Sequence, residues 1–211
     1  GLLIAFFRPS LLNPFMPVYE YEIIPSAHEG YSRHTLTRGN ITYESDYTEY
    51  GLWTNWNDRQ IGQTPLGERI YTIPGQENFV VLFDFMSPIA VFRDSKTPPF
   101  DWRTAKYNEM RLYSTVIATA TPNDPIISTD IQLIQDAISP ILENSSAISS
   151  SQINGSYEGY ALYLYSEKLA GMSYAIGVYI DDSGMVYVAE NTLSKEWFPA
   201  NEAFSELAKS K

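Results

Sequence analysis

The sequence predicts an α+β protein that consists mainly of antiparallel sheet, arranged as two meanders, with two helices packed on one face. Three observations support this prediction. Residues 157–190 contain three successive apolar or alternating runs separated by turn formers, and residues 69–93 contain three more. Two segments, at 129–141 and 199–208, repeat their apolar residues at helical spacing.

The meander at 157–190 is the clearest structural signal in the chain. Its first strand, at 160–165, is apolar on both faces, which is typical of a central strand rather than an edge strand. The buried face of the next two strands is expected to contain Tyr174, Ile176, Val178, Ile180, Val186 and Val188. The loop at 182–184 ends with Gly184, and glycine readily adopts the positive φ that the last position of a three-residue hairpin loop requires.

The N-terminal half predicts a hairpin and the second meander. Residues 31–38 and 41–48 flank Gly39-Asn40, a dipeptide suited to a two-residue turn between strands. The hairpin is polar on both faces and therefore indicates an edge or an exposed ribbon. The strand at 78–85 is the most apolar of this half.

Two helices are expected in the C-terminal half. Thr129 and Gln132 have the spacing of a capping box in front of a stripe of isoleucines, and Pro140 should kink or end that helix. The following segment, 144–151, is low in complexity and indicates a mobile loop. The second helix is expected to begin near Pro199. Its apolar stripe contains Ala200, Ala203, Phe204, Leu207 and Ala208.

The chain can be divided at the proline-rich segment Asp94–Pro99, which favours an extended, exposed path. This predicts a β-rich N-terminal lobe at 1–96 and a β-α-β-β-β-α lobe at 97–211. The alternative interpretation is one continuous domain.

Composition excludes several classes of function. The net charge of −11 disfavours nucleic acids and anionic lipid surfaces as partners. The absence of cysteine excludes disulfides, thiolate metal sites and cysteine nucleophiles. Residues 2–7 are apolar but far shorter than the roughly 20 residues of a membrane span. They are interpreted either as the remnant of an N-terminal membrane anchor or as a first strand or packed arm.

Catalytic and cofactor motifs are sparse. No glycine-rich phosphate loop or GxSxG motif occurs, so the sequence indicates no nucleotide or other cofactor. His28 and His34 lack the spacing of a metal site, and no metal is expected. Asp181 and Asp182 lie in a predicted turn, where aspartate forms local hydrogen bonds.

One cluster of aromatic and acidic residues, at 43–58, predicts a binding site. Aromatic faces stack on sugar rings or apolar groups, while carboxylates accept hydrogen bonds from hydroxyls or amines. The alternative is that these aromatic residues seal the end of a sheet. The candidate ligand-binding residues are Tyr43, Tyr47, Tyr50, Trp53, Trp56, Glu49 and Asp58.

Residues 61–93 contain the pairs Ile61-Gly62, Leu66-Gly67 and Ile70-Tyr71, then Gly75 and an apolar strand. This segment resembles uncharacterised extracytoplasmic domains of membrane-anchored bacterial proteins. The resemblance implies a location outside the cytoplasm and implies no activity.

The sequence therefore favours a non-catalytic extracytoplasmic domain that binds a ligand or a partner protein of unknown identity. One alternative is a carboxylate-dependent glycan hydrolase. The other is an acidic inhibitor or immunity-type protein that covers a basic active site, for which the net charge of −11 is the support.

Overall fold

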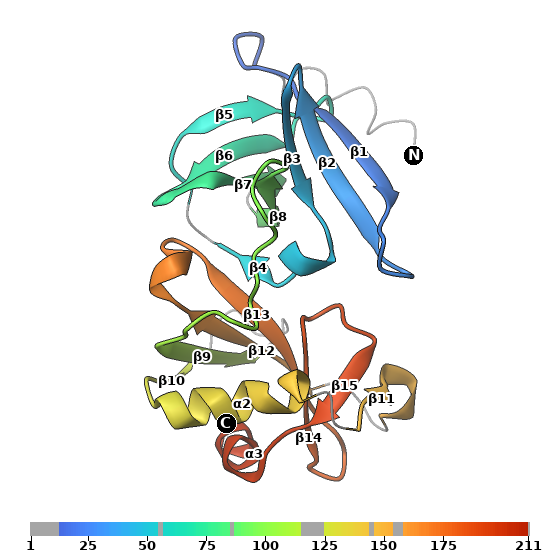
Figure 1. Ribbon diagram of the computed structural model, residues 1–211, viewed down its shortest axis with the longest axis vertical. Coiled ribbons are helices and arrows are strands. Elements are labelled where there is room, and N and C mark those ends of the chain that lie inside the picture. Colours follow the sequence, from blue (N-terminus) through green and yellow to red (C-terminus); the bar gives the residue numbers. More distant parts are fainter. Residues whose placement is uncertain are drawn as a thin grey trace. The chain divides into compact units, whose positions relative to one another are not determined.

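The computed structural model describes residues 13–54, 57–84, 87–114, 125–143, 146–153 and 158–210. The chain forms two compact units, one of Gly1–Asp101 with Leu169–Met172 and one of Trp102–Lys168 with Ser173–Lys211. The sequence placed a lobe boundary at 96/97, whereas the division in the structure lies after Asp101. Within the described residues, two mainly antiparallel sheets and two α-helices confirm the predicted α+β class (Figure 1).

The first unit contains a seven-stranded sheet in the order β1-β2-β3-β8-β7-β6-β5, in which all neighbours are antiparallel. A short strand, β4 (Leu52–Trp53), and the 3-10 helix η2 (Tyr47–Glu49) follow β3. The strands of the sheet are β1 (Glu20–Pro25), β2 (Ser32–Arg38), β3 (Ile41–Ser45), β5 (Gln60–Gln63), β6 (Arg69–Ile73), β7 (Gln76–Asp84) and β8 (Ser87–Asp94).

The predicted hairpin is confirmed as β2 and β3. Its predicted edge position is wrong, because β2 pairs with β1 and β3, and β3 pairs with β2 and β8. Gly39 has a φ of +60°, while Asn40 does not have a positive φ. This is the pattern of a type II′ turn, in which the first central residue alone has positive φ. The register pairs Arg38 with Ile41 across the turn.

The edge strand β5 meets the segment that leads into β1, so the sheet curves back on itself like a barrel. Val18 forms a parallel bridge with Gln63, Tyr19 donates its N–H to the Gln63 carbonyl (2.8 Å), and the Gln63 N–H donates to the Pro17 carbonyl (2.9 Å). The Gln63 amide also binds the backbone of Asn13, at 3.0 Å to its N–H and 2.8 Å to its carbonyl. Gln63 is 3% exposed, and its hydrogen bonds join the two edges.

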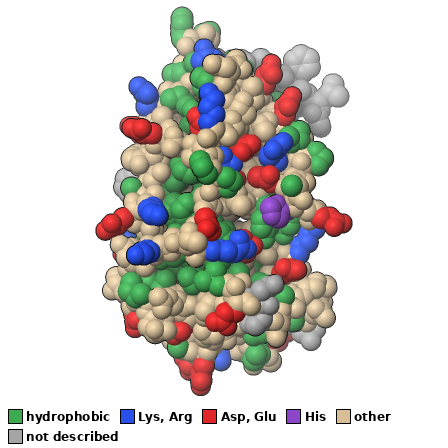
Figure 2. Space-filling model, viewed as in Figure 1, with side chains coloured by type: hydrophobic (Ala, Val, Ile, Leu, Met, Phe, Trp, Pro, Cys, Tyr) green, Lys and Arg blue, Asp and Glu red, His purple; other side chains and the backbone are tan. Residues whose placement is uncertain are grey.

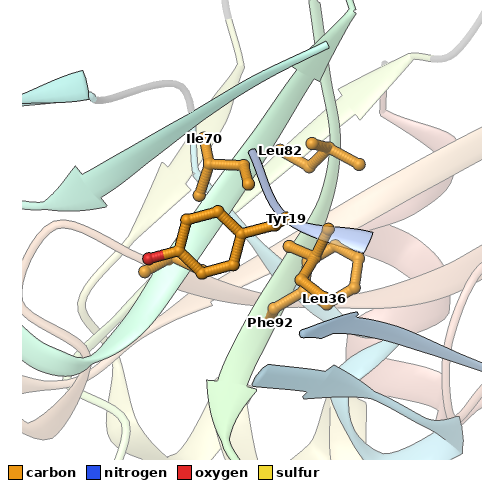
Figure 3. Close-up of a cluster of buried hydrophobic side chains, with 6 residues drawn as sticks. Tyr19, Leu36, Ile70, Leu82 and Phe92 are labelled. Carbon is orange, nitrogen blue, oxygen red and sulfur yellow. The ribbon is translucent and has the colours of Figure 1, made fainter. Parts of the chain in front are cut away.

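The interior of this curved sheet is a compact apolar core, in which Tyr19 lies among aliphatic and aromatic side chains (Figure 3). Leu36, Leu82 and Phe92 are fully buried and come from β2, β7 and β8. Alternate residues of each strand point inward, as the period of a strand requires. The cluster consists of Tyr19, Leu36, Ile70, Val80, Leu82 and Phe92.

The second unit contains a sheet in the order β10-β9-β12-β13-β14-β15-β11. The predicted meander is confirmed as β12, β13 and β14, and β12 is central between β9 and β13. Asp181 Oδ1 accepts the N–H groups of Ser183 and Met185 (both 2.9 Å), which stabilises the predicted turn. The strands are β9 (Glu109–Ser114), β10 (Ile126–Ser128), β11 (Ile148–Ser149), β12 (Glu158–Tyr165), β13 (Ser173–Ile180), β14 (Val186–Ala189) and β15 (Glu196–Pro199).

The helices of this unit are α2 (Ile131–Leu142) and α3 (Glu202–Lys209). They pack against each other, and α2 also contacts β9, β14 and β15. Phe204 and Ala208 of α3 are buried.

Local details of the helix predictions were wrong. The N-cap of α2 is Asp130, whose carboxylate accepts the Gln132 N–H (2.9 Å), rather than Thr129. Pro140 lies inside α2 and does not end it, because the helix continues to Leu142, while the alternative of a kink at Pro140 stays a prediction. Pro199 belongs to β15, and α3 begins three residues later.

Short regular elements occur where a mobile loop was predicted at 144–151. Within the described part of this segment, β11 pairs with β15 and the 3-10 helix η3 (Ser150–Gln152) begins at a Ser149 cap. The predicted strand at 107–119 is β9, and its part beyond Ser114 lies outside the described residues.

We expect Gln63→Ala to lower the free energy of unfolding by about 1–3 kcal/mol, because two hydrogen bonds of a buried amide are lost. Gln60→Ala on the same strand is the matched control. Gln60 is half-buried and its side chain binds the nearby Gly62 carbonyl (3.1 Å). Its replacement should cost less than about 1 kcal/mol. Equal effects of the two variants in urea denaturation would show that the Gln63 side chain does not join the edges.

Candidate functional site

Tyr47 and Tyr50, two of the predicted site residues, lie in one array of aromatic rings on the first unit. We name this set, Tyr21, His28, Tyr31, His34, Tyr47 and Tyr50, the aromatic–histidine array. Tyr47 stacks on His28 with ring centroids 4.5 Å apart and meets the edge of Tyr31 at 4.7 Å. Tyr50 contacts Tyr31 (6.1 Å) and His34 (6.3 Å). Tyr21 stacks on His34 at 5.9 Å.

The helix η2 holds Tyr47 in this position through a capping box. Asp46 accepts the Tyr47 N–H (2.7 Å), and Glu49 accepts the Asp46 N–H (3.1 Å). The Asp46 carboxylate also accepts the Ser26 hydroxyl, while the Tyr50 hydroxyl donates to the Ser32 carbonyl. These bonds join η2 to the end of β1 and the start of β2, because Ser26 directly follows β1 and Ser32 begins β2.

Glu49 forms a buried ion pair beneath the array. Its carboxylate is fully buried and lies 2.9 Å from Nε of Arg93, which is 3% exposed. Nη2 of Arg93 lies 2.5 Å from Glu44, and its Nη1 donates to the Asp94 carbonyl (3.1 Å) and to the Thr97 carbonyl. A buried charge requires such partners. This pairing explains why Glu49 is buried.

Two of the other predicted residues, Tyr43 and Asp58, contact different parts of the first unit. Tyr43 packs against the interior core, with its ring 6.3 Å from Tyr19, and burial raises its pKa. Asp58 is exposed and adjoins β6, where Thr72 Oγ1 lies 3.4 Å from its carboxylate. Trp53 is half-buried in β4. Trp56 lies outside the described residues.

His34 is the titratable centre of the array. The Tyr21 hydroxyl lies within hydrogen-bond distance of its Nδ1 (2.6 Å), and the tautomer of the ring determines which of the two atoms donates. Burial lowers the pKa of His34, and the charge of Asp46 opposes that shift. Burial also raises the pKa of Tyr21. The array therefore favours an uncharged imidazole.

The second unit contains a pocket beside the loop between β14 and β15. We name it the β14–β15 pocket; it has a volume of about 410 Å³, within the range of about 300–1,000 Å³ that holds small ligands. Aromatic side chains and hydroxyls dominate its wall. They are Tyr160, Tyr179, Trp197, Ser150, Thr192 and Ser194, accompanied by Lys195 and by Leu193, which is 63% exposed.

A glycine in β13 allows the aromatic wall of this pocket to form. A Cβ atom at Gly177 would lie 2.9 Å from Cη2 of Trp197 and 3.1 Å from the Asn191 carbonyl oxygen. The indole therefore approaches the sheet at a point where any side chain would collide with it. Trp197 then meets the edge of Tyr179, with ring centroids 6.0 Å apart.

Hydrogen bonds to backbone groups hold the loop that forms the other wall. The Asn191 side chain accepts the Leu193 N–H (2.9 Å), and the Ser194 hydroxyl donates to the Glu196 carbonyl (3.0 Å). The Ser150 N–H donates to the Lys195 carbonyl (3.0 Å), which joins η3 to this loop. The pocket wall is thus largely fixed in advance.

Within the described ranges, no group of three or more His, Asp or Glu side chains is placed to hold a metal ion. His28 and His34 belong to the aromatic–histidine array, in which His28 stacks on Tyr47 and His34 binds Tyr21.

Comparison with protein-family models, with curated proteins and with solved structures gives no match for this chain. The geometry of the sites themselves is therefore the basis for a proposed function.

Sequence reasoning missed the β14–β15 pocket. One signal was present, because Gly177 interrupts an otherwise apolar strand, and a glycine inside a strand often marks close approach of another group. The residues that meet there come from 150–160, 177–179 and 192–197, and their spacing does not reveal that they converge.

We expect His34 to make the protein less stable as the pH falls through about 6.5. Its folded pKa is lowered, so the unfolded state binds more protons between the two pKa values, and folding loses free energy there. His34→Gln removes the titration and should reduce the loss of stability between pH 7.5 and pH 5. Tyr21→Phe removes one hydroxyl and keeps the imidazole buried, so most of the loss of stability should remain in this variant. Identical pH dependence of all three proteins in urea denaturation would contradict this role.

Proposed function

We propose that this chain is a non-catalytic binding domain that holds a small polar ring, such as a saccharide, in the β14–β15 pocket. The observation that supports this proposal is the combination of three aromatic rings with three hydroxyl side chains around a hollow of about 410 Å³. Aromatic faces stack on the apolar face of a sugar ring, while hydroxyls exchange hydrogen bonds with its edge.

The carboxylate-dependent hydrolase is less well supported at this pocket. Glycoside hydrolysis requires two carboxyl groups that flank the scissile bond. None of the described residues that line the pocket is Asp or Glu. Binding without hydrolysis is therefore the better match to this chemistry.

The acidic inhibitor is the second alternative, and its support is still the net charge of −11. The binding hypothesis proposes a small ligand as the partner. Binding of that ligand does not depend on the net charge of the chain.

An extracytoplasmic location is part of the same proposal. It is supported by the resemblance of residues 61–93 to extracytoplasmic domains. No helix of the described chain is long and apolar enough to cross a membrane. Labelling with a membrane-impermeant reagent in the native cells tests the location, and labelling that appears after lysis alone would exclude it.

We expect saturation-transfer NMR with a panel of neutral mono- and disaccharides to detect binding by the parent chain. Trp197→Ala removes the stacking face and should abolish the signal. Because Trp197 packs on the sheet, Leu193→Asp provides a second variant at a largely exposed side chain. It places a charge at the pocket and should weaken binding at least about tenfold while changing stability by less than about 0.5 kcal/mol.

Trp53→Ala is the matched control, because Trp53 lies in β4 of the first unit and does not line the pocket. It should leave saccharide binding unchanged. Loss of binding in Trp53→Ala with retention in Trp197→Ala would instead support the cluster at 43–58. A parent chain that binds no saccharide of the panel would overturn the proposed ligand class.

A further inference from the structure

A second hollow of the second unit runs along α2. We name it the α2 groove; it has a volume of about 1,030 Å³, and its walls are α2, the segment 103–108 and the segment 166–168. Figure 2 shows hydrophobic side chains gathered in a band on this face, with basic side chains along one border. The groove is separate from the β14–β15 pocket, because no described residue lines both.

The floor of the groove is one apolar stripe of α2. Its residues, Ile131, Ile134, Ile138 and Leu142, recur at intervals of three or four and therefore lie along one side of the helix. Ile134 and Ile138 are buried, but Ile131 is 49% exposed and Leu142 is 41% exposed. The helix has 12 residues and is therefore about 18 Å long. The stripe is thus an elongated apolar surface whose two end residues are exposed.

The charge of the groove is opposite to that of its surroundings. The second unit has seven basic and thirteen acidic residues, a net charge of −6. Three of those basic residues, Arg103, Lys106 and Lys168, line the groove, against one described carboxylate, Glu167. Arg103 is held in place because its Nη2 lies 2.9 Å from Glu190, and Lys106 is exposed.

We infer that the α2 groove binds a single-chain amphiphile with an anionic head group, namely a long-chain carboxylate. The apolar stripe receives the chain, and the cations at the wall receive the carboxylate. A volume of about 1,030 Å³ lies just above the range of about 300–1,000 Å³ for small-ligand sites, which favours one extended small molecule over a protein partner. The net charge of −11 disfavours the surface of an anionic membrane as the occupant.

Calorimetric titration of the full chain with dodecanoate, below its micellar concentration, tests this inference. We expect saturable binding that is at least about tenfold tighter than that of dodecanol, which has the same chain without the charge, and tighter than that of hexanoate. Raising the salt concentration should weaken dodecanoate binding and leave dodecanol binding largely unchanged.

Two variants test the two halves of the groove separately. Lys106→Glu with Lys168→Glu should weaken dodecanoate binding at least about tenfold and affect dodecanol little. Ile131→Asp, at an exposed position, should weaken both. The matched control is Lys209→Glu, because Lys209 lies on α3 and is also largely exposed. It should bind dodecanoate as the parent does.

The inference would be overturned by equal affinities for dodecanoate and dodecanol. It would also be overturned if Lys106→Glu with Lys168→Glu left dodecanoate affinity unchanged. Binding to anionic phospholipid vesicles but not to free dodecanoate would assign the groove to a membrane surface instead. Trp197→Ala should retain dodecanoate binding, so this inference and the saccharide proposal can fail independently.

Discussion

The buried contact between Trp102 and Glu190 is the constraint on which the second unit depends. Trp102 is 1% exposed, stacks on Tyr174 with ring centroids 5.1 Å apart, and donates from Nε1 to Glu190 (2.8 Å). The next residue, Arg103, also binds Glu190 and enters the wall of the α2 groove. Glu190 in turn follows β14 and begins the loop that lines the β14–β15 pocket. The Trp102–Glu190 contact therefore fixes the point where the wall of the α2 groove begins and the point where the loop wall of the β14–β15 pocket begins.

The first unit depends on a different kind of constraint, because its sheet must close and its buried charges must be paired. Gln63 joins the two edges, whereas Arg93 neutralises Glu49 of η2 and binds Glu44 of β3. Removing one partner of such a buried pair costs more than the pair itself contributes, since it leaves an uncompensated charge. Glu49 belongs to η2, the same short helix that carries Tyr47, so the buried ion pair supports this part of the aromatic–histidine array.

The sequence could predict the elements whose signals are local. Period-two alternation and glycine turns identified the meander of β12, β13 and β14 and the hairpin of β2 and β3. The curvature of the first sheet depends on a bridge between Val18 and Gln63, and no local pattern reports such a pairing. The same limit applies to the candidate site. Tyr47 and Tyr50 share one short helical turn and lie together, whereas Tyr43 lies against the interior core and Asp58 adjoins β6.

The two hollows of the second unit differ in a way that gives each its own selectivity. The wall of the β14–β15 pocket contains aromatic rings, hydroxyls, Lys195 and no described carboxylate, so it favours a ligand with a ring and a polar edge. The α2 groove offers an apolar stripe and three cations within a unit of net charge −6. Acidic residues elsewhere on the unit repel a carboxylate, and that repulsion is weak beyond about 8 Å at physiological salt. An anionic head group is therefore attracted where the cations gather, and the apolar stripe beside them selects for a chain.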